Sequence, residues 1–205
     1  MDNTLTGKVI GINGPIVKAT GLAGIKMFDI TEVGPDKLIG EVIRLNEDVT
    51  IIQVYEDNGG LKPGDEVTSY GRPLSVLLGP GLISNIYDGI QRPLVGISET
   101  SGSYIRKGIK LSPLDVNKRW DFKPLLKAGT EVNEGSILGE IQESTLILHR
   151  VLIPPGISGK LTHIASPGSY TIEDEVYTVD TGTDKYSGKL AGYWPVRNPR
   201  PRRTR

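Results

Sequence analysis

Short apolar runs alternate with polar residues along most of the chain and predict β-strands joined by tight turns. The first two runs lie in LTGKVIGINGPIVKAT (residues 5–20), on either side of Asn13-Gly14. Asn and Gly tolerate the positive φ values of a tight turn, so this stretch predicts a hairpin. Three more runs follow, GIKMFDIT, KLIGEVIRLN and EDVTIIQVY. We therefore expect residues 1–72 to form a small antiparallel β-barrel or sandwich, with the β-branched run Val49–Tyr55 as a central strand.

A rhythm of glycine turn, short strand, polar turn and second strand then occurs three times. It appears in LKPGDEVTSYGRPLSV (61–76), LKAGTEVNEGSILGEI (126–141) and IASPGSYTIEDEVYTV (164–179). In each copy the glycine supplies a backbone conformation that a side chain would oppose. The last two copies lie within residues 112–190. We expect this region to be a second β-domain, a sandwich whose two half-sheets close over one core.

Residues 73–111 separate the two β-modules and contain the sequence GPGLISNIYDGIQRPL. Leu82, Ile83, Ile86 and Ile90 fall at helical spacing, and Pro93 follows soon after them. A short helix over 82–90 is the natural interpretation, placed after a Gly-Pro-Gly turn and stopped by the proline. The predicted fold class is therefore mainly β, with one short helix between a barrel and a barrel-sandwich-like domain.

The composition indicates which binding partners and which cellular compartment to expect. Lys plus Arg and Asp plus Glu each number 24 in the 205 residues, so a nucleic-acid or acidic membrane partner is not indicated. The absence of cysteine excludes disulfides and thiolate metal sites. The sequence also has no signal-peptide pattern and no apolar run of roughly 20 residues. We expect a soluble, cytoplasmic protein, in which the arginine-rich stretch 197–205 is a solvated end or linker.

Three glycine-rich stretches are candidates for phosphate binding, but a P-loop requires G-x-x-x-x-G-K-[ST] between a strand and a helix. The stretch GPGLISNIYDG contains no lysine. GTDKYSGKL (182–190) has five residues between its glycines, and Leu190 stands where a hydroxyl would bind Mg²⁺. GISGKLTH (156–163) also has leucine after Gly-Lys and lies between predicted strands. No P-loop is predicted.

Other polar residues do not combine into a catalytic group in the sequence. His149 and His163 are 14 residues apart with no carboxylate cluster between them, and His163 fits a strand pattern. The paired acids Asp65-Glu66 and the run Glu173–Glu175 read as turn residues. The hydroxyls of Ser98–Ser103 have no partnered base. We therefore predict no catalytic, cofactor-binding or metal-binding residue in this chain.

The rhythm of residues 112–190 is similar to the barrel-sandwich fold of biotinyl and lipoyl carrier domains. Such carriers present a modified lysine at a hairpin tip, flanked by Met or Asp. Lys160 follows Gly159 without those neighbours. A carrier with Lys160 as its modified residue remains an alternative.

The combined sequence resembles the N-terminal portion of the A subunit, the catalytic subunit of archaeal-type and vacuolar-type (A/V-type) rotary ATPases. The resemblance rests on GKVIGINGPIVKATGL, on GDEVTSYGRPLSVLLGPGLISNIYDGIQRPL and on YWPVRNPRPRR. It extends through LSPLDVNKRWDFKP, GTEVNEGSILGEIQEST and HRVLIPPGISGKLTHIASPGSYTIED, which look like the insertion that distinguishes this subunit. The match covers essentially the whole chain.

The resemblance implies a division into four segments. Residues 1–72 would be the N-terminal barrel, and residues 73–111 would lead into the nucleotide-binding domain. Residues 112–190 would be the inserted bulge domain. Residues 191–205 would be a return strand and a truncated linker to an ATP-binding core that this sequence lacks.

The resemblance also implies partners and cofactors. The complete A subunit would alternate with the B subunit in an A3B3 hexamer, contact central and peripheral stalk subunits, and meet the membrane only through the ion-translocating sector. It would use ATP or ADP with Mg²⁺ to couple hydrolysis or synthesis to transport of H⁺ or Na⁺. The present chain would serve hexamer assembly and stator contact and would be inactive alone. A stand-alone adapter without ATPase activity is the alternative.

Overall fold

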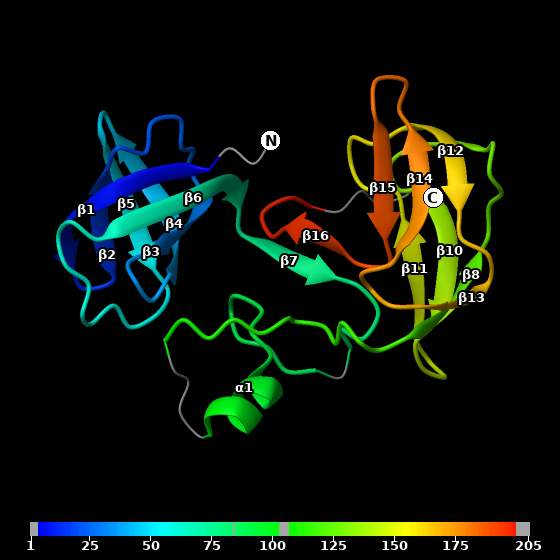
Figure 1. Cartoon of the computed structure of the whole chain (residues 1–205), viewed down its shortest axis with the longest axis horizontal. Coiled ribbons are helices and arrows are strands. Elements are labelled where there is room, and N and C mark those ends of the chain that lie inside the picture. Colours follow the sequence, from blue (N-terminus) through cyan, green and yellow to red (C-terminus); the bar gives the residue numbers. More distant parts are fainter. Residues whose placement is uncertain (1–3, 84, 103–106, 200–205) are drawn as a thin grey trace. The chain divides into compact units, whose positions relative to one another are not determined.

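The computed structural model describes residues 4–83, 85–102 and 107–199. Contacts gather these residues into two compact units, one formed by 4–76, 96–111 and 195–198, the other by 77–95, 112–194 and 199. Each unit is dominated by β-strands, which confirms the predicted fold class (Figure 1). The described residues contain no helix with the length and apolarity that a membrane span requires.

The first unit contains a closed six-stranded antiparallel barrel. Its strands are β1 (Leu5–Asn13), β2 (Ile16–Thr20), β3 (Asp29–Val33), β4 (Leu38–Asn46), β5 (Val49–Val54) and β6 (Glu66–Pro73). They are hydrogen-bonded in the order β1-β2-β5-β4-β3-β6 (Figure 1). Closure leaves no unpaired sheet edge. The predicted central strand is therefore confirmed, because β5 lies between β2 and β4.

Alternation of side chains fills the barrel with aliphatic residues, among them Val9, Val17, Val33 and Ile52, each at most 1% exposed. The predicted hairpin between β1 and β2 is present, but its loop is Gly14-Pro15 and not Asn13-Gly14. Asn13 still pairs with Ile16. Gly14 has a φ of 55°, and glycine as the first central residue followed by proline suits a two-residue hairpin turn.

The second unit contains two four-stranded antiparallel sheets, called here the sandwich. Its strands are β8 (Trp120–Pro124), β9 (Glu131–Val132), β10 (Ile137–Gln142), β11 (Leu148–Leu152), β12 (Gly159–Ile164), β13 (Gly168–Tyr170), β14 (Glu175–Asp180) and β15 (Lys185–Lys189). One sheet has the order β11-β10-β8-β13 and the other β15-β14-β12-β9. A single cluster that includes Phe122, Leu138, Ile141, Leu161 and Val179 forms the core. The expectation of two half-sheets over one core is confirmed.

Two further strands form a small separate sheet. They are β7 (Ser75–Leu78) and β16 (Gly192–Pro195). Residues 75–78 and 192–195 are therefore paired although more than a hundred residues separate them in the sequence.

One turn recurs at strand entrances, and it explains the repeated rhythm. The backbone N–H of the first residue donates to the side-chain oxygen of the fourth, whose own N–H donates back to the first carbonyl. The pairs are Lys26 with Asp29, Lys62 with Asp65, Asn133 with Ser136 and Thr171 with Asp174, with side-chain bonds of 2.7–3.0 Å. Asp and Ser mimic a backbone acceptor in this way.

The third copy of the rhythm, like the second, forms this turn after the glycine that aligns with Gly64. Gly168 lies in β13, whereas the turn of that copy spans Thr171–Asp174 and contains no glycine. Glu173 does not have a positive φ, unlike Gly64 and Gly135 at the same position. The short polar side chain at the fourth position, rather than glycine, is therefore the common requirement of the turn.

The single helix of the described residues is α1 (Leu94–Ser101), so the predicted helix over 82–90 is wrong. Residues 86–94 instead form a closed loop, in which Leu94 N–H donates to Ile86 C=O over 2.9 Å and Tyr87 bridges Pro93. These cross-loop bonds replace helical ones. Pro93 precedes the helix instead of ending it, because a missing N–H and a fixed φ suit a helix start.

Candidate functional site

The residues considered from sequence as possible catalytic groups are not brought together. His149 lies half-buried in β11 and His163 lies exposed in β12, on different sheets of the sandwich. Asp65 and Asp174 are held in the recurring turns, and hydrogen bonding from Thr171 lowers the pKa of Asp174. The hydroxyls of Thr100 and Ser101 donate to carbonyls one helical turn earlier in α1. Ser103, the last hydroxyl of that stretch, lies outside the described residues.

The glycine-lysine stretches considered from sequence as phosphate sites form strands in the structure. The Gly-Lys pairs lie inside antiparallel strands, Lys160 in β12 opposite Asp180 and Lys189 in β15 opposite Glu175. Their backbone is committed to sheet pairing and does not form a loop of converging amides at a helix start. Among the described residues, no group of three or more His, Asp or Glu side chains is arranged to hold a metal ion. Neither Gly-Lys pair therefore has the surroundings that a P-loop requires.

The strand position of Lys160 also bears on the carrier alternative. Lys160 pairs with Asp180 on one side and Glu131 on the other, so it lies between two neighbouring strands. A swinging arm needs a lysine at a hairpin tip, where the backbone turns away from the sheet. The position of Lys160 therefore argues against its modification.

A buried carboxylate on the barrel is the strongest polar feature of the first unit. The Glu41 side chain, on β4, is 4% exposed. Arg197 donates to both of its oxygens, from Nη2 over 2.7 Å and from Nε over 3.3 Å, and the Tyr55 hydroxyl donates over 3.0 Å. The guanidinium also lies 4.4 Å from the centroid of the Phe28 ring. Burial and the bond to Glu41 raise the pKa of Tyr55 to about 12, so its hydroxyl is a donor at neutral pH.

This arrangement adds to one expectation. The stretch 197–205 was predicted to be a solvated end or linker, and its described residues 197–199 are exposed, but its first arginine also binds Glu41 of the barrel. Residues 200–205 lie outside the described residues. Sequence reasoning missed Glu41 and Arg197 because 156 positions separate them. In the sequence, only the family-like string YWPVR drew attention to Arg197, and nothing marked Glu41.

The stretch IYDGIQRPL is organised by side chains that replace backbone bonds. The Gln91 amide accepts from Leu77 N–H over 2.6 Å and donates to Leu77 C=O over 2.8 Å, as a neighbouring strand would. Asp88 accepts from the N–H groups of Ile90 and Arg92 and from Arg92 Nε. Burial opposes the charge of Asp88, but these bonds outweigh it and lower its pKa. The stretch is therefore a structural loop.

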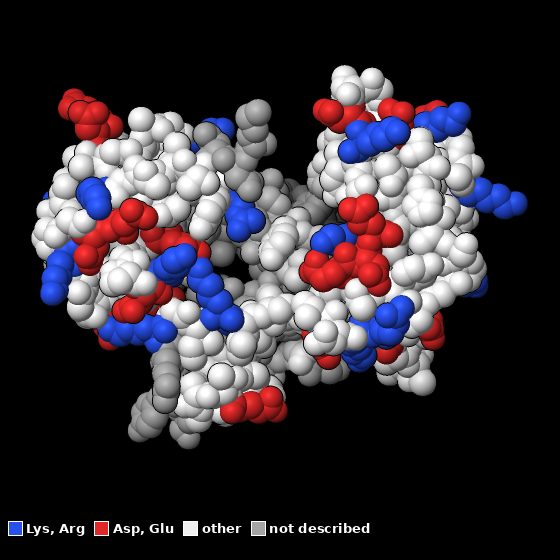
Figure 2. Space-filling model, viewed as in Figure 1, with Lys and Arg blue, Asp and Glu red and all other residues white. Residues whose placement is uncertain are grey.

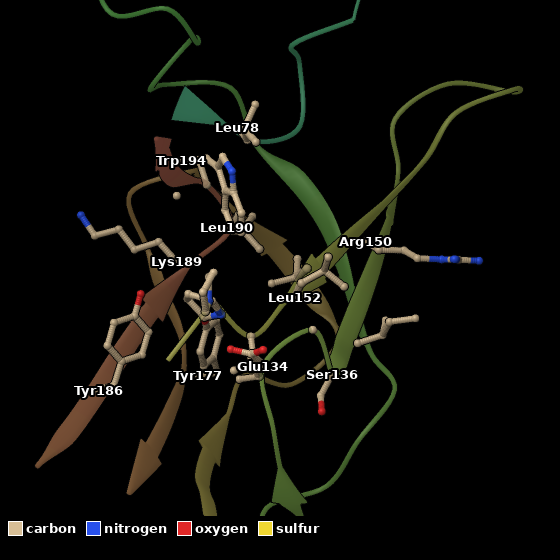
Figure 3. A pocket seen from close by; sticks show the side chains of 18 of the residues that line it. Leu78, Glu134, Ser136, Arg150, Leu152, Tyr177, Tyr186, Lys189, Leu190 and Trp194 are labelled. Carbon is tan, nitrogen blue, oxygen red and sulfur yellow. The ribbon is translucent and has the colours of Figure 1, made fainter. Parts of the chain in front are cut away.

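A cleft of about 880 Å³ lies in the second unit, between the edge strands of the two sheets. Residues 149–152 of β11 line one side, and β15 with the residues that follow it lines the other. Tyr177, Leu152 and Leu190 form much of the interior, whereas the Arg150 and Lys189 side chains extend outward (Figure 3). Burial raises the pKa of Tyr177, so the hydroxyl stays protonated and is no general base. Tyr177 therefore contributes an aromatic ring and a neutral hydroxyl to the wall of the cleft.

Comparison with known proteins identifies both β-domains. Residues 9–71 match the β-barrel domain of the ATP synthase alpha/beta family, and residues 111–197 match the barrel-sandwich domain of the ATP synthase alpha/beta subunit.

The chain is also similar to curated proteins from archaea, bacteria and fungi. It is 49% identical to the A subunit of the A-type ATP synthase of Hyperthermus butylicus over 95% of its length, and 44% identical to the V-type ATP synthase alpha chain 2 of Clostridium tetani over 99%. It is 45% identical to the catalytic A subunit of the V-type proton ATPase of Neurospora crassa over 98%. The chain spans about a third of the length of these relatives, which is 33–34%. It belongs to the ATP synthase alpha/beta family, among the A subunits of the A-type and V-type enzymes.

Proposed function

We propose that this chain is the assembly region of a catalytic A subunit in an A/V-type rotary ATPase, and that the ATP-binding core lies elsewhere in the longer subunit. Sequence identity of 44–49% to A subunits, over 95–99% of the chain, carries the proposal. The chain spans about a third of these A subunits, and its Gly-Lys pairs lie in strands β12 and β15, so the proposal assigns nucleotide binding to another part of the subunit. ATP, ADP and Mg²⁺ then belong to the remainder of the subunit, which couples nucleotide chemistry to movement of H⁺ or Na⁺.

The barrel is the proposed contact with the B subunit in an alternating A3B3 hexamer. Ile10 and Ile12 on β1 and Leu45 on β4 point outward and are 37–48% exposed. Acidic and basic side chains are interspersed on the face shown in Figure 2, with neither sign alone. Because neither charge dominates, apolar contacts between neighbouring barrels meet little repulsion.

The sandwich is the proposed contact with stalk subunits. Leu146 at the tip between β10 and β11 is 94% exposed, and Leu148 next to it is 43% exposed. Exposed leucines grouped at a loop tip are typical of interaction sites. The cleft beside β11 enlarges this surface. The complete assembly would be cytoplasmic and peripheral to a membrane that only other subunits cross.

The test uses the complete A subunit together with the B subunit, plus the stalk subunits of the same enzyme. Ile10→Asp should reduce the fraction of A3B3 hexamer in native mass spectrometry at least about tenfold, since a desolvated charge at an interface costs about 1.4 kcal/mol or more. Leu146→Asp is the matched control, which should leave the hexamer intact and weaken copurification of stalk subunits. Normal hexamer and normal copurification in both variants would contradict the proposal.

The mass of the native protein distinguishes a stand-alone adapter from a region of a longer subunit. An antibody against this chain should recover a protein about three times its 22.2 kDa, given the share of the relatives that it covers. Recovery of a protein near 22 kDa would favour the adapter.

A further inference from the structure

Residues 195–198 are held on the barrel by few backbone bonds. Val196 N–H donates to Leu74 C=O over 3.0 Å, and β16 pairs only with β7 among the described strands. An isolated two-stranded sheet is marginal in water. Some additional interaction must therefore keep this segment in place.

The Glu41 carboxylate supplies that interaction from inside the barrel wall. A carboxylate with 4% exposure is strongly disfavoured without a counter-charge, and Arg197 provides one in a two-pronged geometry. Arg197 is itself half-exposed and can leave, whereas Glu41 cannot. Separating Arg197 from Glu41 would therefore leave an unpaired, buried carboxylate in the barrel.

We propose that Glu41 and Arg197 form a latch that fixes residues 195–198 to the barrel, with Phe28 and Tyr55 holding the two charged groups in register. The Phe28 ring lies beneath the guanidinium, and the Tyr55 hydroxyl donates to the carboxylate oxygen that also accepts from Nη2. This inference rests on the proposed function for its consequence. In the longer subunit, a closed latch makes the barrel and the segment that follows the sandwich move together.

Amide hydrogen exchange in the 205-residue chain tests the latch without nucleotide or partner subunits, so its outcome does not depend on the proposed function. Arg197→Met keeps an apolar stem against Phe28 and removes the charge. The Val196 amide should then exchange at least about tenfold faster, while amides of β5 keep their protection. Arg197→Lys keeps the charge but cannot donate to both Glu41 oxygens as the guanidinium does. The Val196 amide should then exchange at an intermediate rate. Arg150→Met, an exposed arginine of the sandwich, is the matched control.

A second readout reports the local geometry. Glu41→Gln should lower the pKa of Tyr55 from about 12, because the carboxylate raises it, and Arg197→Met should raise it further, because the guanidinium opposes that effect. Tyrosinate absorbance or Tyr55 ring chemical shifts measure both changes. Unchanged Val196 exchange in Arg197→Met overturns the latch. Equal acceleration of Val196 and β5 also overturns it, since the pair would then support the whole barrel. Unchanged Tyr55 titration in both variants overturns the assigned contacts.

Discussion

Gly139, on β10, shows how tightly single residues are specified in the sandwich core. A Cβ atom there would lie 2.3 Å from the Phe122 ring and 2.8 Å from the Lys123 carbonyl oxygen. Phe122 is 2% exposed, and Leu138 beside Gly139 is fully buried, so neither can move aside easily. The glycine is required by space and not by its φ.

Gly139→Ala should therefore destabilise the sandwich by about 1–3 kcal/mol, the usual cost of overpacking. Urea unfolding followed by tryptophan fluorescence measures this loss, because Trp120 lies in the same core. Gly89→Ala is the control, since a Cβ atom at Gly89 meets nothing within 4 Å. Equal stability of the two variants would show that the core yields at Phe122.

Asp88 gives stability that depends on pH. Its pKa in the folded state lies below the ordinary value of 3.8, because bonds from Arg92 and Ile90 outweigh the effect of burial. A lowered folded pKa contributes stability above the unfolded pKa, and this contribution is lost as pH falls through the folded value. The wild type should therefore exceed Asp88→Asn in stability at pH 7, and the difference should shrink from about pH 4 downward. Urea unfolding at several pH values tests this, and a constant difference would contradict it.

At the scale of elements, a side chain can make the backbone hydrogen bonds that a neighbouring strand would otherwise make. Gln91 is buried, and its amide satisfies both the N–H and the C=O of Leu77. Within the described residues no strand pairs with Leu77 at that side, so Gln91 alone joins the loop 86–94 to Leu77, while the Tyr87 hydroxyl of the same loop donates to Pro113 C=O. Patterns of apolar spacing contain no sign of such a bond.

Gln91→Met keeps the length of the side chain and leaves two buried backbone groups without partners. We expect a loss of about 2–6 kcal/mol, at about 1–3 kcal/mol for each group. Thermal unfolding measures it, and Asn85→Ala, which removes an exposed bond to Gly81, is the control. A loss no larger than that of the control would mean that water reaches Leu77.

The same scale shows which elements a sequence can predict. Strands of the barrel and sandwich follow from local alternation and from turns in which four consecutive residues bond to one another, as Lys62–Asp65 do. The helix was misplaced because Leu82, Ile83, Ile86 and Ile90 have helical spacing, yet the backbone bonds of this stretch cross a loop. The attachment of Arg197 to Glu41 was missed because nothing local marks it. Strands and their turns were predictable from local pattern, whereas the helix and the long-range pairing were not.

For the whole molecule, the two compact units contain all the described residues, and the division into segments 1–72, 73–111, 112–190 and 191–205 stays a prediction. Residues 73–111 are shared, since 77–95 belong to one compact unit and 96–111 to the other. Resemblance supplied the family, whereas strand patterns alone reached only a modular β-protein. The proposed role in assembly therefore needs a direct test with the complete A subunit and its partner subunits.

Nucleotide binding would change the stability of the whole chain. A site for ATP with Mg²⁺ would stabilise the folded chain by about 2.7 kcal/mol at a ligand concentration about 100 times Kd. Gly-Lys pairs that lie in strands β12 and β15 offer no such site, so millimolar ATP with Mg²⁺ should leave the melting temperature of the chain unchanged. The complete A subunit of a relative is the positive control and should melt at a higher temperature with ATP. A rise in the present chain would instead locate a nucleotide site within its own residues and overturn its assignment as an assembly region.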